Sequence, residues 1–406
     1  MGVLLRYRFI GDYIGVNGLL HKLKIFQKVY YGWFILIIAG LGVFFSGPGQ
    51  TYSNSQFIDE YILEFGWSRS QVSSVYSIAT LTAGLLMIFI GRFIDRFGLR
   101  FMMVLIGSLF LLACFFNSFI SSIWMLAIGF FLVRILGQGS MSLIPNTLLA
   151  QWFVKKRGKA FGLLTLFSFA SASVFPIVNT WIIQNWSWQA AWQFWGFALL
   201  LLFVPIAFFG VVNRPENIGL EPDGLRSKQG DSTVLLSATA KEAEQDWTLK
   251  EAMKTRAFWA ILICVGIPAM VNTGITFHIS SIMQMNGLSI EVAALVLSLM
   301  AIVGIPMALV SGFIVDKIKT NYILFFIFVV QFIILLLLIV TDKFWLAIIF
   351  GILWGISGGL ERIGLNVIWP NYFGRKYIGS INGVGMTMVV IGSSLGPMPF
   401  GIGYDY

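Results

Sequence analysis

Three charged side chains lie inside long apolar runs of this 406-residue sequence. Arg134 interrupts the run 123–151, and Glu361 and Arg362 are neighbours in the run 344–369. Charges are costly in the middle of a bilayer, so they usually mark a pathway for a substrate or an ion. A guanidinium can bind a carboxylate through two parallel hydrogen bonds, and an acidic side chain can carry a proton. These residues are therefore our first candidates for binding and coupling.

Each charged candidate also has a structural alternative. Arg134 lies about 11 residues from one end of its run, or roughly 16 Å along a helix, which is near the bilayer midplane. We expect it to bind an anionic substrate group, and the alternative is an arginine bonded to helix carbonyls. We expect Arg362 to be a second anion-binding cation, and Glu361 to be its counter-ion or a proton carrier. Adjacent helix positions do not face each other, so one of this pair should face a cavity; the alternative is an ion pair that holds helices together.

Uncharged polar side chains, several of them beside helix-breaking residues, form a second set of candidates. Gly47-Pro48-Gly49 interrupts the first apolar run, and broken helices in membranes line cavities. The polar substrate contacts that we expect are Gln50, Tyr52, Asn146, Asn272 and Thr276. His278 is expected to pack between helices or to lie at the membrane interface, and the alternative is a protonatable gate.

A glycine followed four residues later by an aspartate and then by cations occurs twice, about 221 positions apart, between apolar runs. The residues of this repeated signature are Gly91, Asp95, Arg96, Gly98, Arg100, Gly312, Asp316 and Lys317. Glycine lets helix ends approach closely, and an aspartate at the end of one helix can face the positive N-terminus of a neighbour. We expect these two short loops to form a conformational latch between the halves of the molecule. The alternative is that they only supply positive charge to one side of a membrane.

Further matches at the same spacing indicate that the chain is an internal repeat. Gly162 and Pro176 recur as Gly383 and Pro397, again at an offset of 221. Membrane carriers are commonly built from two such repeats around a central site. The sixth apolar run, near 191–212, has no partner in the second half. We therefore expect eleven helices of an intended twelve because of a truncation, and the alternative is a native eleven-helix protein.

The composition predicts an all-α membrane protein. Hydrophobic residues make up 58% of the chain and charged residues 11%, whereas soluble domains carry about 25% charged residues. The mean hydropathy is +0.85, and the 38 phenylalanines suit lipid-facing surfaces. The eleven predicted spans lie near 31–55, 70–91, 101–119, 123–151, 160–184, 191–212, 257–282, 289–313, 322–341, 344–369 and 378–402.

The cations are distributed unevenly along this topology. With the N-terminus in the cytoplasm, 23 of the 27 lysines and arginines fall on the inner side. The net charge of +9 is then explained by helix orientation and contact with anionic lipid, and no nucleic-acid partner is expected. The predicted units are a cytoplasmic N-terminal segment, a first bundle, a polar linker, partly helical near 239–255, and a second bundle. They cover residues 1–30, 31–212, 213–256 and 257–406. The linker is expected to be a spacer, with regulation as the alternative.

The sequence gives little support for an enzyme. It contains no Walker-type phosphate loop, no HExxH and no CxxC, and with two histidines a Ser-His-Asp triad is not expected. The two cysteines, Cys114 and Cys264, both lie in apolar runs and suggest neither a disulfide nor a metal site. We expect no metal, no cofactor and no cleaved signal peptide.

Several features resemble the major facilitator superfamily. They are the paired Gly-Asp-cation loops, the six-plus-six repeat and the central linker, and they cover essentially the whole chain. The stretch 134–139, Arg-Ile-Leu-Gly-Gln-Gly, resembles the superfamily's RxxxGxG motif on helix 4, with a slightly different spacing. Other stretches resemble the oxalate/formate antiporter and monocarboxylate porter branches; they are 30–33, 64–69, 214–216, 219–224 and 369–375.

The resemblance implies a monomeric secondary transporter of the cell membrane whose two bundles rock around a central site. The branch and the two intramembrane arginines lead us to expect a small organic anion, such as a monocarboxylate, carried with H⁺ or in exchange for another anion. The alternative is proton-coupled efflux of amphiphilic or drug-like compounds. It is favoured by the aromatic-rich composition and by the single cavity acid.

Overall fold

The computed structural model describes residues 30–224, 246–396 and 399, and within these residues its regular structure is helical throughout. Eleven helices are long and apolar enough to cross a membrane, and a missing twelfth helix is consistent with this count. The first half contains α2 (Tyr31–Phe45), η3 (Gly47–Gly49), α3 (Thr51–Phe65), α4 (Arg69–Phe97), α5 (Leu99–Asn117), α6 (Ile123–Val133), η4 (Arg134–Ser140), α7 (Met141–Trp152), α8 (Arg157–Asn185), α9 (Trp188–Ala198), η5 (Leu199–Phe203) and α10 (Val204–Gly210). The second half contains α12 (Leu249–Ala252), α13 (Arg256–Met285), α14 (Ile290–Val315), α15 (Thr320–Ile339), α16 (Phe344–Phe373) and α17 (Ile378–Leu395). Two short 3₁₀ turns, η6 (Pro215–Ile218) and η7 (Pro222–Gly224), open the linker.

Local sequence signals explain where several helices begin. The hydroxyl groups of Ser122, Ser187 and Thr255 accept a backbone N–H three residues on, which satisfies a group that the helix itself leaves unpaired. Ser68 and Gln71 form a reciprocal capping box at the start of α4. The same helix is broken after Phe97 only because Gly98 adopts a positive φ of 87°.

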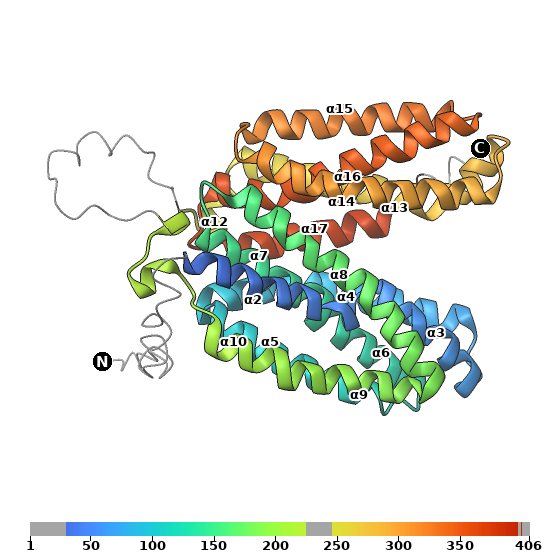
Figure 1. Ribbon diagram of the computed structural model, residues 1–406, viewed down its shortest axis with the longest axis horizontal. Coiled ribbons are helices and arrows are strands. Elements are labelled where there is room, and N and C mark those ends of the chain that lie inside the picture. Colours follow the sequence, from blue (N-terminus) through green and yellow to red (C-terminus); the bar gives the residue numbers. More distant parts are fainter. Residues whose placement is uncertain (1–29, 225–245, 397–398, 400–406) are drawn as a thin grey trace, which may run out of the picture.

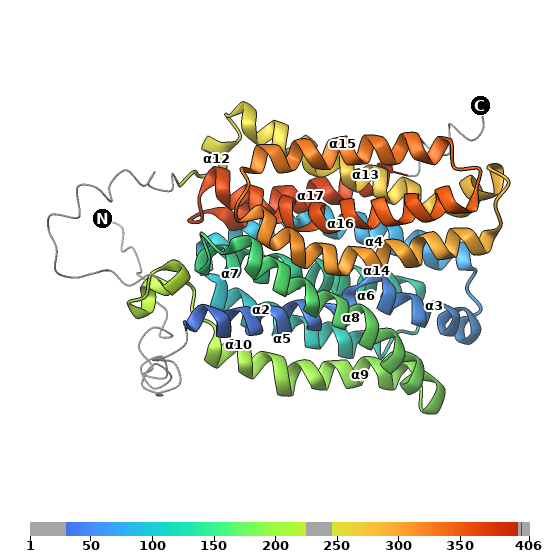
Figure 2. The same ribbon diagram turned by 45° about the horizontal axis from the view of Figure 1, so that its top comes forward.

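The helices form two bundles that lie side by side, with α4, α8, α14 and α17 between them (Figures 1 and 2). One continuous hydrophobic core fills the first bundle and extends into α14, α15 and α16 of the second, and two smaller clusters fill the rest of the second bundle. We call the end that carries the short connections before α5, α8, α15 and α17 the cationic end. The first residues of the linker and α12 lie at this end (Figure 1).

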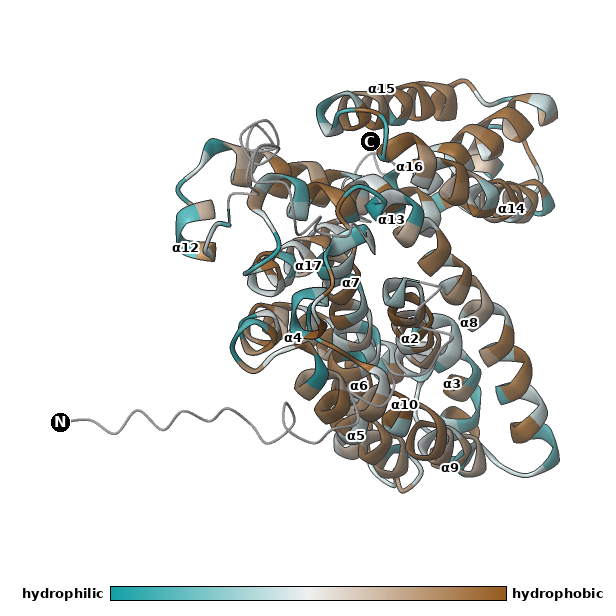
Figure 3. Ribbon diagram, turned by 60° about the vertical axis from the view of Figure 1, so that its left-hand side comes forward, coloured by the Kyte–Doolittle hydropathy of each residue, from teal (hydrophilic) through white to brown (hydrophobic). Residues whose placement is uncertain are grey.

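The outer surface of the bundles is apolar and suits a lipid solvent. The helix α15 has the highest mean hydropathy of the eleven spans, 3.1, and yet only 33% of its window is buried by protein. Its exposed side chains include Phe325, Phe332 and Ile339, and its ribbon is hydrophobic along most of its length (Figure 3). Such a surface would be unstable in water, and a multi-pass membrane protein explains it.

Three details differ from the sequence-based prediction. The first span continues through the break at 47–49 to Phe65, because α3 resumes the helix after a single extended residue. The repeated signature over 92–100 is not a loop, since α4 runs to Phe97 and α5 starts at Leu99. Within the described part of 239–255, only the four-residue α12 is helical, and residues 239–245 lie outside the described chain.

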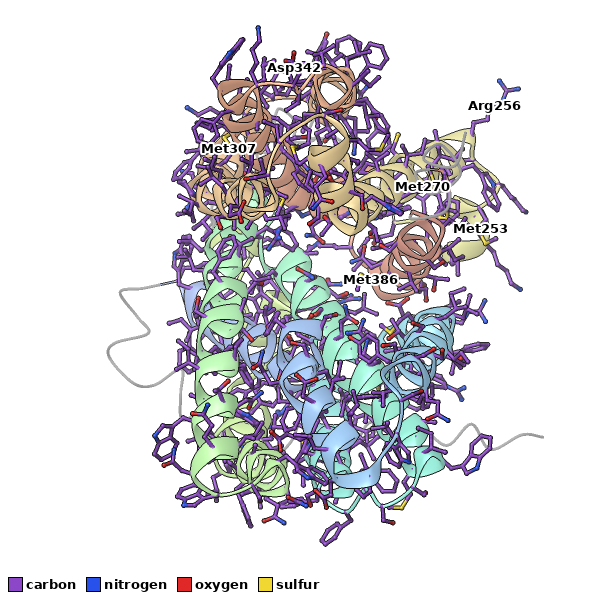
Figure 4. All side chains as sticks on the ribbon, turned by 90° about the vertical axis from the view of Figure 1, so that its right-hand side faces the viewer. Met253, Arg256, Met270, Met307, Asp342 and Met386 are labelled. Carbon is purple, nitrogen blue, oxygen red and sulfur yellow. The ribbon has the colours of Figure 1, made fainter. Side chains whose placement is uncertain are left out.

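Glycines allow the two bundles to touch backbone to backbone near the cationic end. A Cβ atom on Gly91 of α4 would lie 2.3 Å from the carbonyl oxygen of Gly379 on α17. A Cβ on Gly158 of α8 would lie 2.2 Å from the carbonyl oxygen of Gly312 on α14. Further along α17, Met386 packs against the core of the first bundle (Figure 4). The contacts are pseudo-symmetric, because Gly91 and Gly312 are equivalent positions of the repeat.

We predict that Gly91→Ala weakens the contact between the bundles, because the added methyl group cannot fit against a fixed carbonyl oxygen. Overpacking of this kind costs about 1–3 kcal/mol. The measurement is the melting temperature of the purified protein in detergent. Gly358→Ala is the matched control, since a Cβ at that helical position meets nothing within 4 Å. Equal melting temperatures for the two variants would contradict the prediction.

Candidate functional site

The acidic residue Glu361 is held by a network that joins α13 to α16. Asn272 donates its side-chain amide to both carboxylate oxygens of Glu361, at 3.2 and 3.0 Å. The indole of Trp354 donates to the amide oxygen of Asn272 at 2.8 Å, so the orientation of the amide is fixed. The structure therefore brings together two residues expected from the sequence and adds Trp354, which stands two helical turns before Glu361 on the same face.

Arg362 lies where the second bundle meets the first. Its guanidinium carbon is 5.4 Å from the centre of the Phe169 ring on α8, and its side chain is exposed. No carboxylate of the described ranges forms a salt bridge with it, Glu361 included. The charge of the neighbouring Glu361 still acts on the guanidinium. An exposed cation without a salt bridge, at the boundary of the bundles, is suited to an anionic ligand.

Arg134 occupies a different environment in the first bundle. It is 5% exposed, and it donates to the carbonyl oxygen of Gly49 at 3.1 Å and to the hydroxyl of Thr51 at 3.3 Å. The guanidinium also lies 5.0 Å from the centre of the Tyr76 ring. Its Nε is buried without a hydrogen-bond partner, and no described carboxylate neutralises the group. The contact with a helix carbonyl matches the structural alternative, while the unused donor leaves capacity for a ligand.

The local helix geometry explains how Arg134 reaches η3, the break between α2 and α3. Residues Arg134–Ser140 form a π-helical segment, a distortion that is frequent at functional sites. A Cβ on Gly137 would lie 2.8 Å from the Cα of Gly49, so both positions require glycine for the close approach. The Arg-Gly pattern of η4 and the Gly-Pro-Gly break at η3 thus face each other in one contact.

The other polar candidates form bonds within their own bundles. Tyr52 donates to the hydroxyl of Ser171 at 2.7 Å and so connects α3 to α8. The remaining bonds are local: Gln50 to the hydroxyl of Ser46, Asn146 to the carbonyl of Ser142, and Thr276 to the carbonyl of Asn272. His278 lies on α13, partly exposed and with at least one interaction of its own. Of the uncharged candidates, Asn272 alone contacts a charged candidate among the bonds described.

A hollow of about 410 Å³ lies on the half of α8 remote from the cationic end. Pro176, Ile177, Thr180, Trp181 and Gln184 line it. At 3.6 residues per turn, Pro176 and Thr180 share the helix face of Phe169, which contacts Arg362. The face of α8 that packs against the second bundle near the cationic end therefore borders the hollow in the C-terminal half of the helix.

The first aspartate of the repeated signature binds the N-terminus of a helix in the other bundle. Asp95, near the end of α4, accepts the backbone N–H of Gly379 at 3.0 Å and that of Ser380 at 2.7 Å. The hydroxyl of Ser380 donates to the same carboxylate. Because Gly379 and Ser380 lie in the first turn of α17, the carboxylate both caps that helix and faces its positive dipole.

The second aspartate repeats this arrangement. Asp316, at the end of α14, accepts the N–H of Gly158 at 2.6 Å and that of Lys159 at 3.1 Å, both in the first turn of α8. Burial raises the pKa of Asp316, and the hydrogen bonds from these two amides act in the opposite direction. Each bundle thus provides a carboxylate to a helix N-terminus of the other.

Side chains beyond the signature add a second pair of contacts at the cationic end. Arg157 donates to the side-chain oxygen of Asn371 at 2.8 Å, and Arg375 donates to the carbonyl of Gln151 at 2.9 Å. Gln151 and Asn371 are equivalent in the repeat, at an offset of 220. Glu216 of the linker forms a salt bridge of 2.6 Å with Arg375. The two bundles are therefore closed against each other at this end.

Sequence reasoning missed several of these partners. Trp354 could have been found from its two-turn spacing to Glu361, and Gln151 from its match to Asn371 in the repeat. Ser380 carried no signal of its own, because a serine in the first turn of a helix is common. Among the described residues, no group of three or more His, Cys, Asp or Glu side chains could hold a metal ion.

Comparison with known proteins identifies the class to which this fold and site belong. The family model described as Major Facilitator Superfamily matches residues 33–397, so the chain belongs to that superfamily. Solved structures agree: the proton:xylose symporter XylE aligns with a TM-score of 0.65 at 15% identity, over 92% of this chain and 89% of its own. The human organic anion transporter MFSD10 aligns with a TM-score of 0.60 at 11% identity, over 90% of this chain and 92% of its own. At such identities the likeness concerns the fold alone.

Curated relatives come from Bacillus subtilis (strain 168). The MFS-type transporter YhcA is 26% identical over 239 residues, which are 56% of this chain and 43% of YhcA. The MFS-type transporter YcxA is 24% identical over 189 residues, which are 45% of each chain. The alignments thus span less than half the length of these relatives.

We predict that Asp95→Ala and Asp316→Ala each increase access to the interface at the cationic end, because helix N-terminal amides lose a charged partner worth about 1.5–3 kcal/mol per bond. The measurement is the maleimide labelling rate of Ala308→Cys, in a chain whose own two cysteines are alanine. Ala308 is fully buried on α14 and belongs to the hydrophobic core that continues from the first bundle into the second.

The matched control is Asp342→Ala, because Asp342 is an exposed carboxylate on the connection after α15. It should leave the labelling rate unchanged. Severalfold faster labelling is expected for the two signature variants; equal rates in all the chains would show that the carboxylates do not close the interface.

Proposed function

We propose that this chain is a secondary transporter that moves a small organic anion by alternating access. The observation that carries the proposal is the exposed guanidinium of Arg362, which lies against Phe169 of the other bundle and forms no salt bridge in the described chain. A cation at the boundary of two moving halves attracts an anion, and its position lets the ligand contact both halves. A monocarboxylate matches the single fork of one guanidinium.

Arg134 takes the second role in this proposal. Its hydrogen bond to Gly49 holds the break at η3 against η4, and its buried Nε remains available as a donor. A bound carboxylate that reached this donor would satisfy a polar group that otherwise costs free energy. Tyr52 connects α3 to α8 in the same bundle, so a ligand that moves the break at η3 would also act on this hydrogen bond.

Glu361 is the proposed proton carrier or counter-ion. It stands next to Arg362 and is held by Asn272, so a change in its charge would act directly on the field at the anion site. Protonation of Glu361 removes a negative charge beside the bound anion. Uptake of a proton and of an anion would then favour each other, which is the requirement for H⁺ symport.

The cationic end is proposed to face the cytoplasm, according to the positive-inside rule. In this orientation the carboxylate contacts close the inner side, and the hollow on α8 lies toward the outside. The two signature aspartates then form the latch that must break before the site opens inward.

We predict that Arg362→Gln lowers uptake of the transported anion at low concentration by about 10- to 100-fold, the effect of losing a charge-assisted hydrogen-bond pair. The measurement is uptake by proteoliposomes of formate, acetate, lactate, pyruvate and oxalate, with and without an inward proton gradient. Arg256→Gln is the matched control, because Arg256 is exposed and projects away from the helices (Figure 4). Wild-type uptake by the Arg362 variant would exclude Arg362 as the anion site. If the wild type carries none of the five anions, efflux of amphiphilic compounds becomes the next function to test.

We predict that Glu361→Gln abolishes the stimulation of uptake by a proton gradient and retains anion exchange, because glutamine keeps one acceptor oxygen for the amide of Asn272 but cannot take up a proton. The measurement compares gradient-driven uptake with exchange at equal pH on both sides. Glu291→Gln is the matched control, because it removes an exposed carboxylate at the start of α14. A Glu361 variant that still responds to the gradient would contradict this role.

A further inference from the structure

The linker after the first bundle carries a buried carboxylate with an unusual backbone. Asp223 has a φ of 60°, and it is the one non-glycine residue with positive φ in the described chain. Its side chain is 8% exposed. Asp and Asn tolerate the left-handed region better than other side chains, but the conformation still costs free energy and needs a compensating contact.

That contact is with the connection that leads into α8. The carboxylate of Asp223 accepts three consecutive backbone N–H groups, from Val154 at 3.1 Å, Lys155 at 2.8 Å and Lys156 at 3.1 Å. Successive N–H groups that converge in this way form an anion-binding concavity, and here the anion is supplied by the chain itself. The linker therefore fixes the backbone just before the first turn of α8.

The next amides along the chain belong to the latch. Gly158 and Lys159 donate to Asp316 of the second bundle, so two carboxylates together accept five of the six amides of residues 154–159. Asp223 belongs to the linker segment that follows α10 in the first bundle, and its neighbour Gly224 packs against Tyr30. The Asp223 contact can therefore persist when the bundles separate, whereas the Asp316 contact must break.

A related contact exists on the other side of the repeat. Asp246, at the end of the linker, accepts the N–H of Lys376, just before the first turn of α17, at 3.1 Å. Lys156 and Lys376 are equivalent in the repeat, at an offset of 220. Trp247 also donates its backbone N–H to Phe373 at 3.0 Å. The linker is thus bonded to two connections. Asp223 bonds to the connection before α8, and Asp246 bonds to the connection before α17. The N-termini of these two helices are the ones that bind an aspartate of the opposite bundle.

We propose that Asp223 is a positioning residue for the latch: it holds residues 154–156 so that the α8 amides face Asp316, and it thereby favours closure at the cationic end. Without it, this connection must be ordered anew each time the bundles close. A segment that must become ordered when the bundles close loses conformational entropy, and this loss opposes closure. A segment that is already ordered does not lose this entropy again. The inference concerns gating and holds whatever solute is carried.

The test measures the distance between spin labels at Phe209→Cys and Tyr322→Cys, in a chain whose own cysteines are alanine. Both positions are exposed, Phe209 at the end of α10 and Tyr322 at the start of α15. Distances are recorded without substrate in lipid nanodiscs, so the result is independent of the proposed anion. Asp223→Gly removes the carboxylate and leaves an unstrained residue at positive φ. We expect the ratio of closed to open populations to fall roughly tenfold, the effect of about one charge-assisted hydrogen bond.

Three further chains make the result decisive. Asp223→Asn keeps one acceptor oxygen and tolerates the same backbone, so it should shift the populations less than Asp223→Gly; it replaces the glycine variant if that does not fold. Asp316→Asn is the positive reference, and Glu221→Gln, an exposed carboxylate two residues away, is the matched control. An unchanged distance distribution for the Asp223 variants, beside a shifted one for Asp316→Asn, would overturn the proposal. A lower melting temperature with unchanged populations would also overturn it, because it would assign Asp223 to folding alone.

Discussion

The structure depends on carboxylates that satisfy helix N-termini across the boundary of the two bundles. The first N–H groups of an α-helix have no partner within the helix, and in a membrane protein they need one from elsewhere. Here Asp95 serves α17 and Asp316 serves α8, so each helix end is completed only when the bundles are closed. The glycines beside these aspartates permit the short distance that the bonds require. Closure at the cationic end is thus a matter of backbone hydrogen bonding rather than of charge alone.

Much of this arrangement could be read from the sequence, because a repeat restricts it strongly. The spacing between Asp95 and Asp316, together with the apolar runs, predicted two equivalent bundles, and the fold and superfamily are confirmed. The role of glycine at helix ends was also a sequence-level argument. By contrast, the side-chain contacts of Arg134 and Glu361 depended on which helix faces meet, and one sequence does not determine that. The contact between Arg134 and Gly49 needed the π-helical distortion of η4, for which the glycines were a weak signal.

The intramembrane charges separate into two environments. Arg134 is enclosed in the first bundle and bonded to backbone, whereas Arg362 is exposed where the bundles meet. A chain that used both only for stability would be expected to neutralise them, since an unpaired charge in a bilayer costs several kcal/mol or more. Glu361 likewise hydrogen-bonds to the amide of Asn272 and forms no salt bridge with an arginine among the described residues. Within the described chain, neither Arg134 nor Arg362 forms a salt bridge, so both guanidinium groups can still bind an anion.

The two capped helix ends are equivalent in position but unequal in strength. Asp95 receives two amides and a hydroxyl, while Asp316 receives two amides, and the contact of α4 with α17 continues to Thr387, whose hydroxyl donates to Gly84 at 2.9 Å. Because the two contacts differ in their number of hydrogen bonds, we expect the bundles to open asymmetrically. The α8–α14 contact would separate first, and the α4–α17 contact would act as the hinge. The rotation axis would then lie off the pseudo-symmetry axis of the repeat, a geometry that paired distances across each contact can measure.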